Sequence, residues 1–251
     1  MKIIIIGDLH GEWLWLNMLL NKQLPDLVIS VGDFGWFPHL HSPIQHRPRR
    51  SYNPHEFNVK TPRRFDQYGI RNPKNVPIYF CPGNHENWED LLLRPGKKPI
   101  DLMPNVYYIP RGGILELPYP FRTTLFIGGA DSIDKLDRDR GIDWWPEELI
   151  TLGDIYNLPD KKIYTVISHT CPIEFKSILF KEKKRDPFWE GKFKDPSCEM
   201  LSLVWEKYKP RTWFFGHFHV TREFKYRDTK AFALNKAPDS GWWKSFDIQG
   251  D

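Results

Sequence analysis

The sequence predicts an α/β fold with more than one β-sheet, and three observations indicate it. Short apolar runs rich in β-branched residues alternate along the chain with stretches of helical periodicity. A run of four isoleucines, at positions 3–6, begins close to the N-terminus, and such a run needs apolar surroundings on both faces of a strand. Candidate strands are denser in the second half of the chain, which favours a second sheet. We expect one domain spanning residues 1–251.

The predicted elements alternate along the chain. A buried strand covers residues 2–6, and a short helix over 13–20 follows a Gly-Glu pair. Further strands are expected at 27–31, 76–81, 106–109, 124–127, 163–168 and 213–215. Residues 148–158 and 197–208 have helical patterns, and each begins at a capping residue or a first-turn proline. Residues 221–226 alternate as an edge strand does, and the tail after 237 has no assignable pattern.

The composition is that of a folded protein with reduced thiols. Of the 251 residues, 40% are hydrophobic and 27% are charged, which excludes wholesale disorder. The three cysteines are an odd number without CxxC spacing, which indicates a reducing compartment. The apolar run at 3–6 is far shorter than the ~20 residues that span a bilayer. We therefore expect a cytoplasmic protein that does not bind membranes.

One segment supplies the whole basic excess of the chain. Residues 38–74 carry eight lysines and arginines against two acidic residues, a net charge of +6, whereas the remainder carries −2. The same segment holds six of the 22 prolines and four of the nine histidines, without strand or helix periodicity. We interpret residues 38–75 as a basic, Pro/His-rich surface insertion, for which a functional loop and a solvated loop both remain open.

A potential metal ligand directly follows each of five predicted strands. In open α/β sheets this carboxyl edge is where ligands bind. Aspartate, asparagine and histidine side chains together suit Mn, Fe, Zn, Ni or Co rather than a thiolate site. Seven candidates are too many for one four-coordinate ion but suffice for two divalent ions, most simply Mn²⁺, if one carboxylate bridges them. The candidates are Asp8, His10, Asp33, Asn84, His169, His217 and His219.

These blocks resemble, in order and over residues 7–219, the calcineurin-like metallophosphoesterase superfamily. The matching blocks are Asp8-x-His10, Gly32-Asp33, Gly83-Asn84-His85-Glu86, His169 and Gly216-His217-x-His219. The resemblance implies an α/β/β/α sandwich, in which two packed mixed β-sheets are flanked by helices. It also implies one ion held by Asp8, His10, Asp33 and His219. The second ion would be held by Asp33, Asn84, His169 and His217, with Asp33 bridging.

The resemblance further implies metal-dependent phosphoester hydrolysis. A hydroxide bridging the ions would attack phosphorus in line, and His85 matches the family histidine that binds the phosphoryl oxygen or protonates the leaving group. A phosphomonoesterase is the first interpretation; a phosphodiesterase or nuclease, and a catalytically inactive binding module, are the alternatives. The expected partner is a phosphorylated small molecule, nucleotide or phosphoprotein. Nucleic acid remains open as a partner, and so does the oligomeric state.

The sequence departs from the phosphoprotein phosphatases of this superfamily. Trp36 and Phe37 stand where those enzymes carry aspartate and arginine, and Pro82 stands where they carry a second arginine. The acidic partner of His85 and two phosphate-binding arginines are therefore missing from their usual places. The insertion could supply substitutes, because arginine binds phosphate strongly and directionally. The candidates for substrate binding are Arg47, Arg49, Arg50, Arg63 and Arg64.

Overall fold

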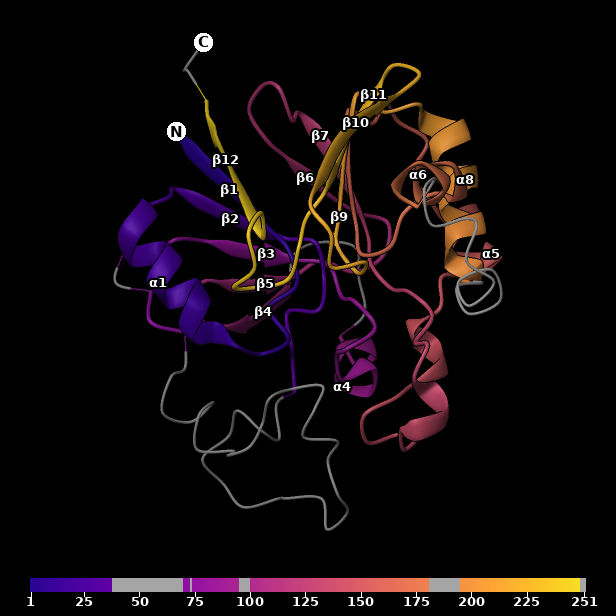
Figure 1. The fold of residues 1–251 in the computed structure, drawn as a ribbon, viewed down its shortest axis with the longest axis horizontal. Coiled ribbons are helices and arrows are strands. Elements are labelled where there is room, and N and C mark those ends of the chain that lie inside the picture. Colours follow the sequence, from indigo (N-terminus) through magenta and orange to yellow (C-terminus); the bar gives the residue numbers. More distant parts are fainter. Residues whose placement is uncertain (38–69, 73, 95–99, 181–194, 249–251) are drawn as a thin grey trace.

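A computed structural model of the chain shows two six-stranded sheets packed face to face, with helices on both outer faces (Figure 1). The structure describes residues 1–37, 70–72, 74–94, 100–180 and 195–248. The predicted fold class, two packed mixed sheets flanked by helices, is confirmed.

The first sheet has four parallel strands at its centre and one antiparallel strand at each edge. Its order is β12-β1-β2-β3-β5-β4, in which β12 and β4 are the antiparallel strands. Because β-strand side chains alternate, Ile4 and Ile6 face helix α1, whereas Ile3 and Ile5 face the other sheet. The strand bounds are β1 Lys2–Ile6, β2 Leu27–Ser30, β3 Ile78–Phe80, β4 Ile100–Met103, β5 Val106–Tyr108 and β12 Trp243–Asp247.

The second sheet repeats this plan in the order β10-β11-β9-β8-β7-β6, with β10 and β6 antiparallel at its edges. Its inner face contributes Phe126, Ile167 and Phe214 to the core between the sheets. The strand bounds are β6 Gly113–Glu116, β7 Thr123–Ile127, β8 Thr165–Ser168, β9 Thr212–Phe215, β10 Arg222–Tyr226 and β11 Thr229–Ala233.

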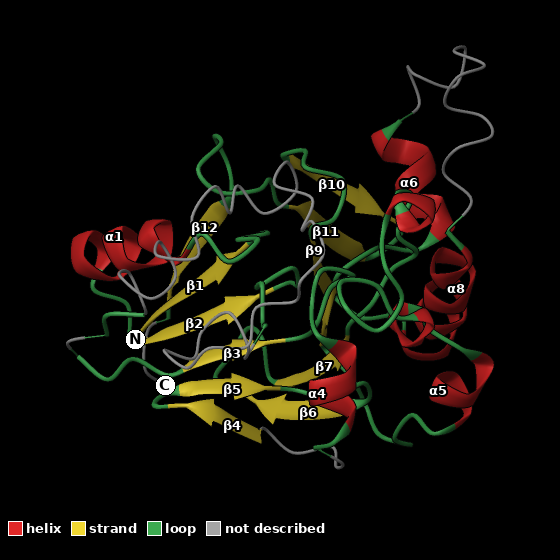
Figure 2. Ribbon diagram, turned by 90° about the horizontal axis from the view of Figure 1, so that it is seen from below, coloured by secondary structure: helices red, strands yellow, loops and turns green. Residues whose placement is uncertain are grey.

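The helices bury the outer faces of the two sheets. Helix α1 (Trp13–Gln23) lies along the first sheet, and α5 (Leu152–Tyr156), α6 (Ile173–Leu179) and α8 (Pro196–Tyr208) gather on the far side of the second (Figure 2). Helix α4 (Trp88–Leu92) follows β3, and short 3₁₀ helices cover Lys135–Asp137 and Pro146–Glu148. The helices cover the faces of the sheets, and loops lie at the carboxyl ends of the parallel strands.

Each strand expected from the sequence is present, but the helix predicted over 148–158 is shorter than expected. Residues 152–156 alone are α-helical, because a capping box between Thr151 and Asp154 starts the helix at Leu152. Glu148 instead ends a 3₁₀ helix, and its side chain is buried. The unassigned tail contains β12, which pairs antiparallel with β1 and covers that edge of the sheet.

Most of the predicted insertion lies outside the described residues. This includes all five arginines expected to bind substrate, Arg47, Arg49, Arg50, Arg63 and Arg64, so their role stays a prediction. Across the described ranges, none of the helices combines the length and apolar character needed to cross a bilayer. Cys81, Cys171 and Cys198 are buried free thiols.

Candidate metal centre

The candidate ligands converge from the carboxyl ends of five parallel strands, three in one sheet and two in the other. The loops after β1, β2 and β3 carry Asp8, His10, Asp33 and Asn84, and the loops after β8 and β9 carry His169, His217 and His219. The strands in each set are neighbours, so their ends meet at one edge of each sheet. The structure thus brings together all seven residues that the sequence singled out.

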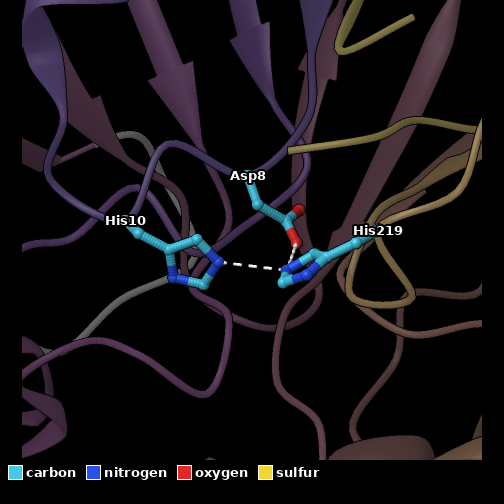
Figure 3. Close-up of side chains that lie close together, drawn as sticks. All are labelled: Asp8, His10 and His219. Atoms are coloured by element: carbon cyan, nitrogen blue, oxygen red, sulfur yellow. Dashed lines mark hydrogen bonds and ion pairs between the residues drawn. The ribbon is translucent and has the colours of Figure 1, made fainter. Parts of the chain in front are cut away.

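The first group contains Asp8, His10 and His219, each of which offers one ligand atom within 4.8 Å of the other two (Figure 3). The Nε2 atom of His219 lies 3.2 Å from Oδ2 of Asp8 and 3.1 Å from Nε2 of His10. Both carboxylate oxygens of Asp8 accept the backbone N–H of His217, at 3.0 and 3.3 Å. That bond ties the loop after β9 to the loop after β1.

The second group is centred on Asp33 and His169. Nε2 of His169 lies 3.3 Å from Oδ2 of Asp33 and 3.0 Å from Oδ1 of Asn84. The same Asn84 oxygen lies 3.1 Å from Nδ1 of His217. Oδ2 of Asp33 is also 3.7 Å from Nδ1 of His10, so this carboxylate lies between the two groups. Asp33 therefore lies where a single carboxylate could contact an ion in each group.

The donor atoms of these side chains fit divalent ions. Nδ1 of His10 is buried and has no hydrogen-bond partner, although it lies beside a carboxylate. Nδ1 of His169 lies 3.2 Å from the backbone carbonyl of Val31, to which its N–H can donate, and Nε2 faces the site. A histidine that ligates a metal characteristically donates its second ring N–H in this way. A bound cation would accept the lone pairs of the carboxylate, amide and imidazole atoms that face one another here.

Two glycines allow the carboxylates to approach the backbone of neighbouring loops. A Cβ at Gly83 would lie 2.0 Å from Oδ1 of Asp33, and a Cβ at Gly216 would lie 2.0 Å from Oδ1 of Asp8. Any side chain at either position would displace a ligand. Backbone strain gathers in the loops after β1, β2 and β9, where φ is positive at His10, Asp33, His217 and His219. Such conformations are costly for residues other than glycine and cluster at functional sites.

The surroundings of Asp33 keep its carboxylate ionised. Burial alone would raise the pKa of Asp33, but the neighbouring imidazoles, above all His169, hold that pKa well below its usual range. Burial disfavours a charged His169, yet Asp33 and Asp8 raise its pKa to about 9. Burial, reinforced by His169, lowers the pKa of His217 to about 3. The site thus offers an ionised Asp33 and a neutral His217, and these are the forms in which the two residue types bind metals.

His85 lies at the rim of the ligand groups. Its backbone N–H donates to Oδ1 of Asp33 at 2.8 Å, and its Nε2 is 4.0 Å from the other oxygen of that carboxylate. The guanidinium of Arg138 contacts the imidazole ring of His85 from the segment after β7. The sequence reasoning missed Arg138, which stands in an acidic stretch without any metal-ligand pattern.

A hydrogen-bond chain fixes the amide of Asn84. Nδ2 of Asn84 donates to Oγ of Ser132 at 3.0 Å, and that hydroxyl donates to Oε2 of Glu148 at 2.9 Å. The other oxygen of Glu148 accepts Ser132 N–H at 2.7 Å and Trp144 Nε1–H at 3.1 Å. In this arrangement the Ser132 hydroxyl donates to Glu148 and accepts from Asn84, so the amide oxygen faces the histidines. Ser132 and Glu148 were not predicted as site residues.

Comparison with known proteins places these features in a family. The model of the calcineurin-like phosphoesterase family matches residues 1–221. Phosphopantetheinyl hydrolase (PptH) from Mycobacterium tuberculosis is 13% identical with a TM-score of 0.44, over 98% of this chain and 95% of that chain. GAP50, the anchor in the inner membrane complex of Plasmodium, is 11% identical with a TM-score of 0.44, over 94% of this chain and 71% of that chain. No curated protein matches the chain.

The Asn84–Ser132–Glu148 chain predicts that Ser132→Ala weakens metal binding. Loss of the hydroxyl frees the amide to rotate, and loss of an outer-shell partner of this kind costs roughly 10- to 100-fold in metal affinity. Titration of the metal-free protein with Mn²⁺, followed by calorimetry, measures the effect. Ser202→Ala is the matched control, because Ser202 also donates to a carboxylate, that of Glu174, at 2.8 Å. Equal affinities in the two variants would contradict the role of Ser132.

Proposed function

The chain belongs to the calcineurin-like phosphoesterase family, and from that premise we propose that it hydrolyses phosphate monoesters at a dinuclear metal centre. Membership makes it a metal-dependent hydrolase of phosphoester bonds, and the alternative of an inactive binding module is set aside. The preference for monoesters, the identity of the ions and the roles of individual residues are the proposal. The cytoplasm is its proposed location, because all three cysteines are free thiols.

One observation carries the proposal: ligand-type side chains from five strand ends in two sheets meet within hydrogen-bonding distance of one another. We assign the first ion to Asp8, His10, Asp33 and His219. The second is assigned to Asp33, Asn84, His169 and His217, with Asp33 shared. When bound, two divalent ions supply Lewis acidity and lower the pKa of water, so that a nucleophile is available at neutral pH.

The charge of the site favours a dianion. Two divalent ions bring four positive charges, and the two aspartates among the ligands return two negative ones. A net charge of about +2 suits the dianionic group of a phosphate monoester better than the single charge of a diester. His85 lies beside the bridging carboxylate, where its ring can donate a hydrogen bond to a phosphoryl or leaving-group oxygen. The proposed substrate is therefore a phosphorylated small molecule, nucleotide or phosphoprotein.

A substrate panel tests the monoester proposal. We expect kcat/KM with Mn²⁺ or Ni²⁺ to be at least about tenfold higher for p-nitrophenyl phosphate than for bis-p-nitrophenyl phosphate, a difference of about 1.4 kcal/mol in transition-state stabilisation. Cyclic nucleotides and single-stranded DNA complete the panel. A preference for any of these diesters would make the enzyme a phosphodiesterase or nuclease instead.

The ligand set predicts that EDTA abolishes activity and that Mn²⁺ or a similar transition ion restores it better than Mg²⁺. Imidazole nitrogens suit transition ions, whereas Mg²⁺ prefers carboxylates and water.

Asp33→Asn should cause the largest loss of bound metal among single ligand changes, because it weakens the binding of both ions. Elemental analysis after dialysis measures this, with Asp247→Asn, at an exposed strand residue, as the control. Two ions retained by Asp33→Asn would contradict the shared ligand.

His85→Asn should keep both ions and lose roughly 10²–10⁴ in kcat, the usual scale for a residue that moves a proton in the transition state. Its loss should be smaller for p-nitrophenyl phosphate than for phenyl phosphate, because p-nitrophenolate leaves without needing a proton. Steady-state kinetics on the two esters, with the metal content measured alongside, checks this. Equal losses on both esters would make His85 a ligand of the phosphoryl oxygen rather than an acid.

A further inference from the structure

Residues 131–148, which follow β7, place a buried arginine against the proposed site. The side chain of Arg138 is 0% exposed, and a charged group at that depth is tolerated only when it is paired and hydrogen-bonded. The carboxylate of Asp134 meets the guanidinium at both Nε and one terminal nitrogen, each at 2.8 Å. The other terminal nitrogen donates to the backbone carbonyl of Asp143 at 3.3 Å. Arg138 is therefore fixed by its own segment.

The guanidinium is directed at the imidazole of His85. One terminal nitrogen of Arg138 lies 2.7 Å from Nδ1 and 2.8 Å from Nε2 of that ring. The His85 side chain is 13% exposed, so it lies nearer to solvent than the arginine behind it. On its site-facing side the ring is 4.9 Å from the ring of His10. Arg138 thus contacts the site through His85.

The direction of this contact constrains the histidine. Arginine has donors and no acceptor, so it can bond only to a ring nitrogen that offers a lone pair. The same guanidinium nitrogen lies within 2.8 Å of both ring nitrogens, so a neutral His85 accepts from it through the nitrogen that carries no proton. The planar guanidinium, held by Asp134 and Asp143, also restricts rotation of the ring. Such placement matters because an error of about 1 Å in a reacting group can cost roughly 10²-fold in rate.

The segment that carries Arg138 is itself anchored. Glu148 accepts hydrogen bonds from Ser132 and Trp144, which joins the start of the segment to its end. The backbone N–H of Asp131 donates to Oδ1 of Asp195, the residue before helix α8. The position of the guanidinium is therefore determined by buried contacts on several sides.

We propose that Arg138, clamped by Asp134 and the carbonyl of Asp143, is the positioning residue for His85 in phosphoester hydrolysis. This inference rests on the proposed function, in which His85 acts on the phosphoryl or leaving-group oxygen. It adds that the action of His85 depends on Arg138, a residue outside every ligand block. The metal ligands themselves do not depend on it.

Kinetics of the full chain loaded with Mn²⁺ test the dependence. The variants are Arg138→Met, His85→Asn and the double variant, and the substrates are p-nitrophenyl phosphate and phenyl phosphate. We expect Arg138→Met to lower kcat roughly 10- to 100-fold with the same leaving-group profile as His85→Asn, since a misplaced group loses about this much. The double variant should be no slower than His85→Asn alone, because residues acting as a unit are not additive. Arg140→Met, an exposed position in the same segment, is the matched control.

The outcomes separate the inference from the proposed function. Wild-type kcat in Arg138→Met, or losses that multiply in the double variant, would overturn the positioning role while leaving His85 and the proposed function intact. Wild-type kcat in His85→Asn would overturn the role of His85 and this inference together. Loss of metal in Arg138→Met would also contradict it, because the proposal leaves the ligands unaffected.

Two further measurements test the inference even if Arg138→Met folds poorly or if neither ester is a good substrate. Arg138→Lys keeps the positive charge but not the planar guanidinium with its several N–H donors, so it should fold and lose less activity than Arg138→Met. The ¹⁵N chemical shifts of the His85 ring should move in Arg138→Met and Arg138→Lys and stay unchanged in Arg140→Met. Unchanged ring shifts in all three variants would overturn the contact without reference to any substrate.

Discussion

The burial of two carboxylates side by side is the constraint on which the rest of the site depends. Asp8 is 0% and Asp33 1% exposed, and their ligand atoms lie within 4.8 Å. At an effective dielectric constant near 20, two like charges at that distance repel by roughly 3.5 kcal/mol. Backbone N–H groups from His217 and His85 and the imidazole of His169 offset part of this repulsion. The remaining demand for positive charge is what makes the site one for cations.

That demand explains the local backbone. A carboxylate can be held this deep only if neighbouring loops approach it closely, and Gly83 and Gly216 permit that approach. The loops after β1, β2 and β9 adopt positive φ at four ligand positions, a cost that the two sheets can sustain because their parallel strands fix where each loop begins. The isoleucines of β1, buried on both faces, keep the loop that carries Asp8 at the meeting point of the two sheets. The packing of the core therefore determines the geometry of the site.

The sequence predicted the parts of the fold and site that are local. The apolar runs predicted as strands at residues 2–6 and 163–168 contain β1 and β8, because a short run buried on both faces is typical of a parallel strand, and the ligand blocks stand directly after them. Contacts between distant segments carry no such signal. Trp243–Asp247 is a strand because it pairs with β1, and Glu148 lies outside the predicted helix, with its carboxylate buried against Ser132. Arg138 stands among acidic residues, and such a sequence pattern is the same whether the arginine is exposed to solvent or buried.

The two adjacent residues Asn84 and His85 show how one strand end serves two purposes. Their side chains diverge, the amide toward His169 and His217 and the imidazole toward the rim. Each is held by a different residue of the segment after β7, Asn84 by Ser132 and His85 by Arg138. Ser132 and Arg138 make separate hydrogen bonds, the first to a proposed metal ligand and the second to the proposed reacting group. If the proposed roles hold, this loop supports metal binding and turnover through separate contacts, which a single support shared by both residues would not allow.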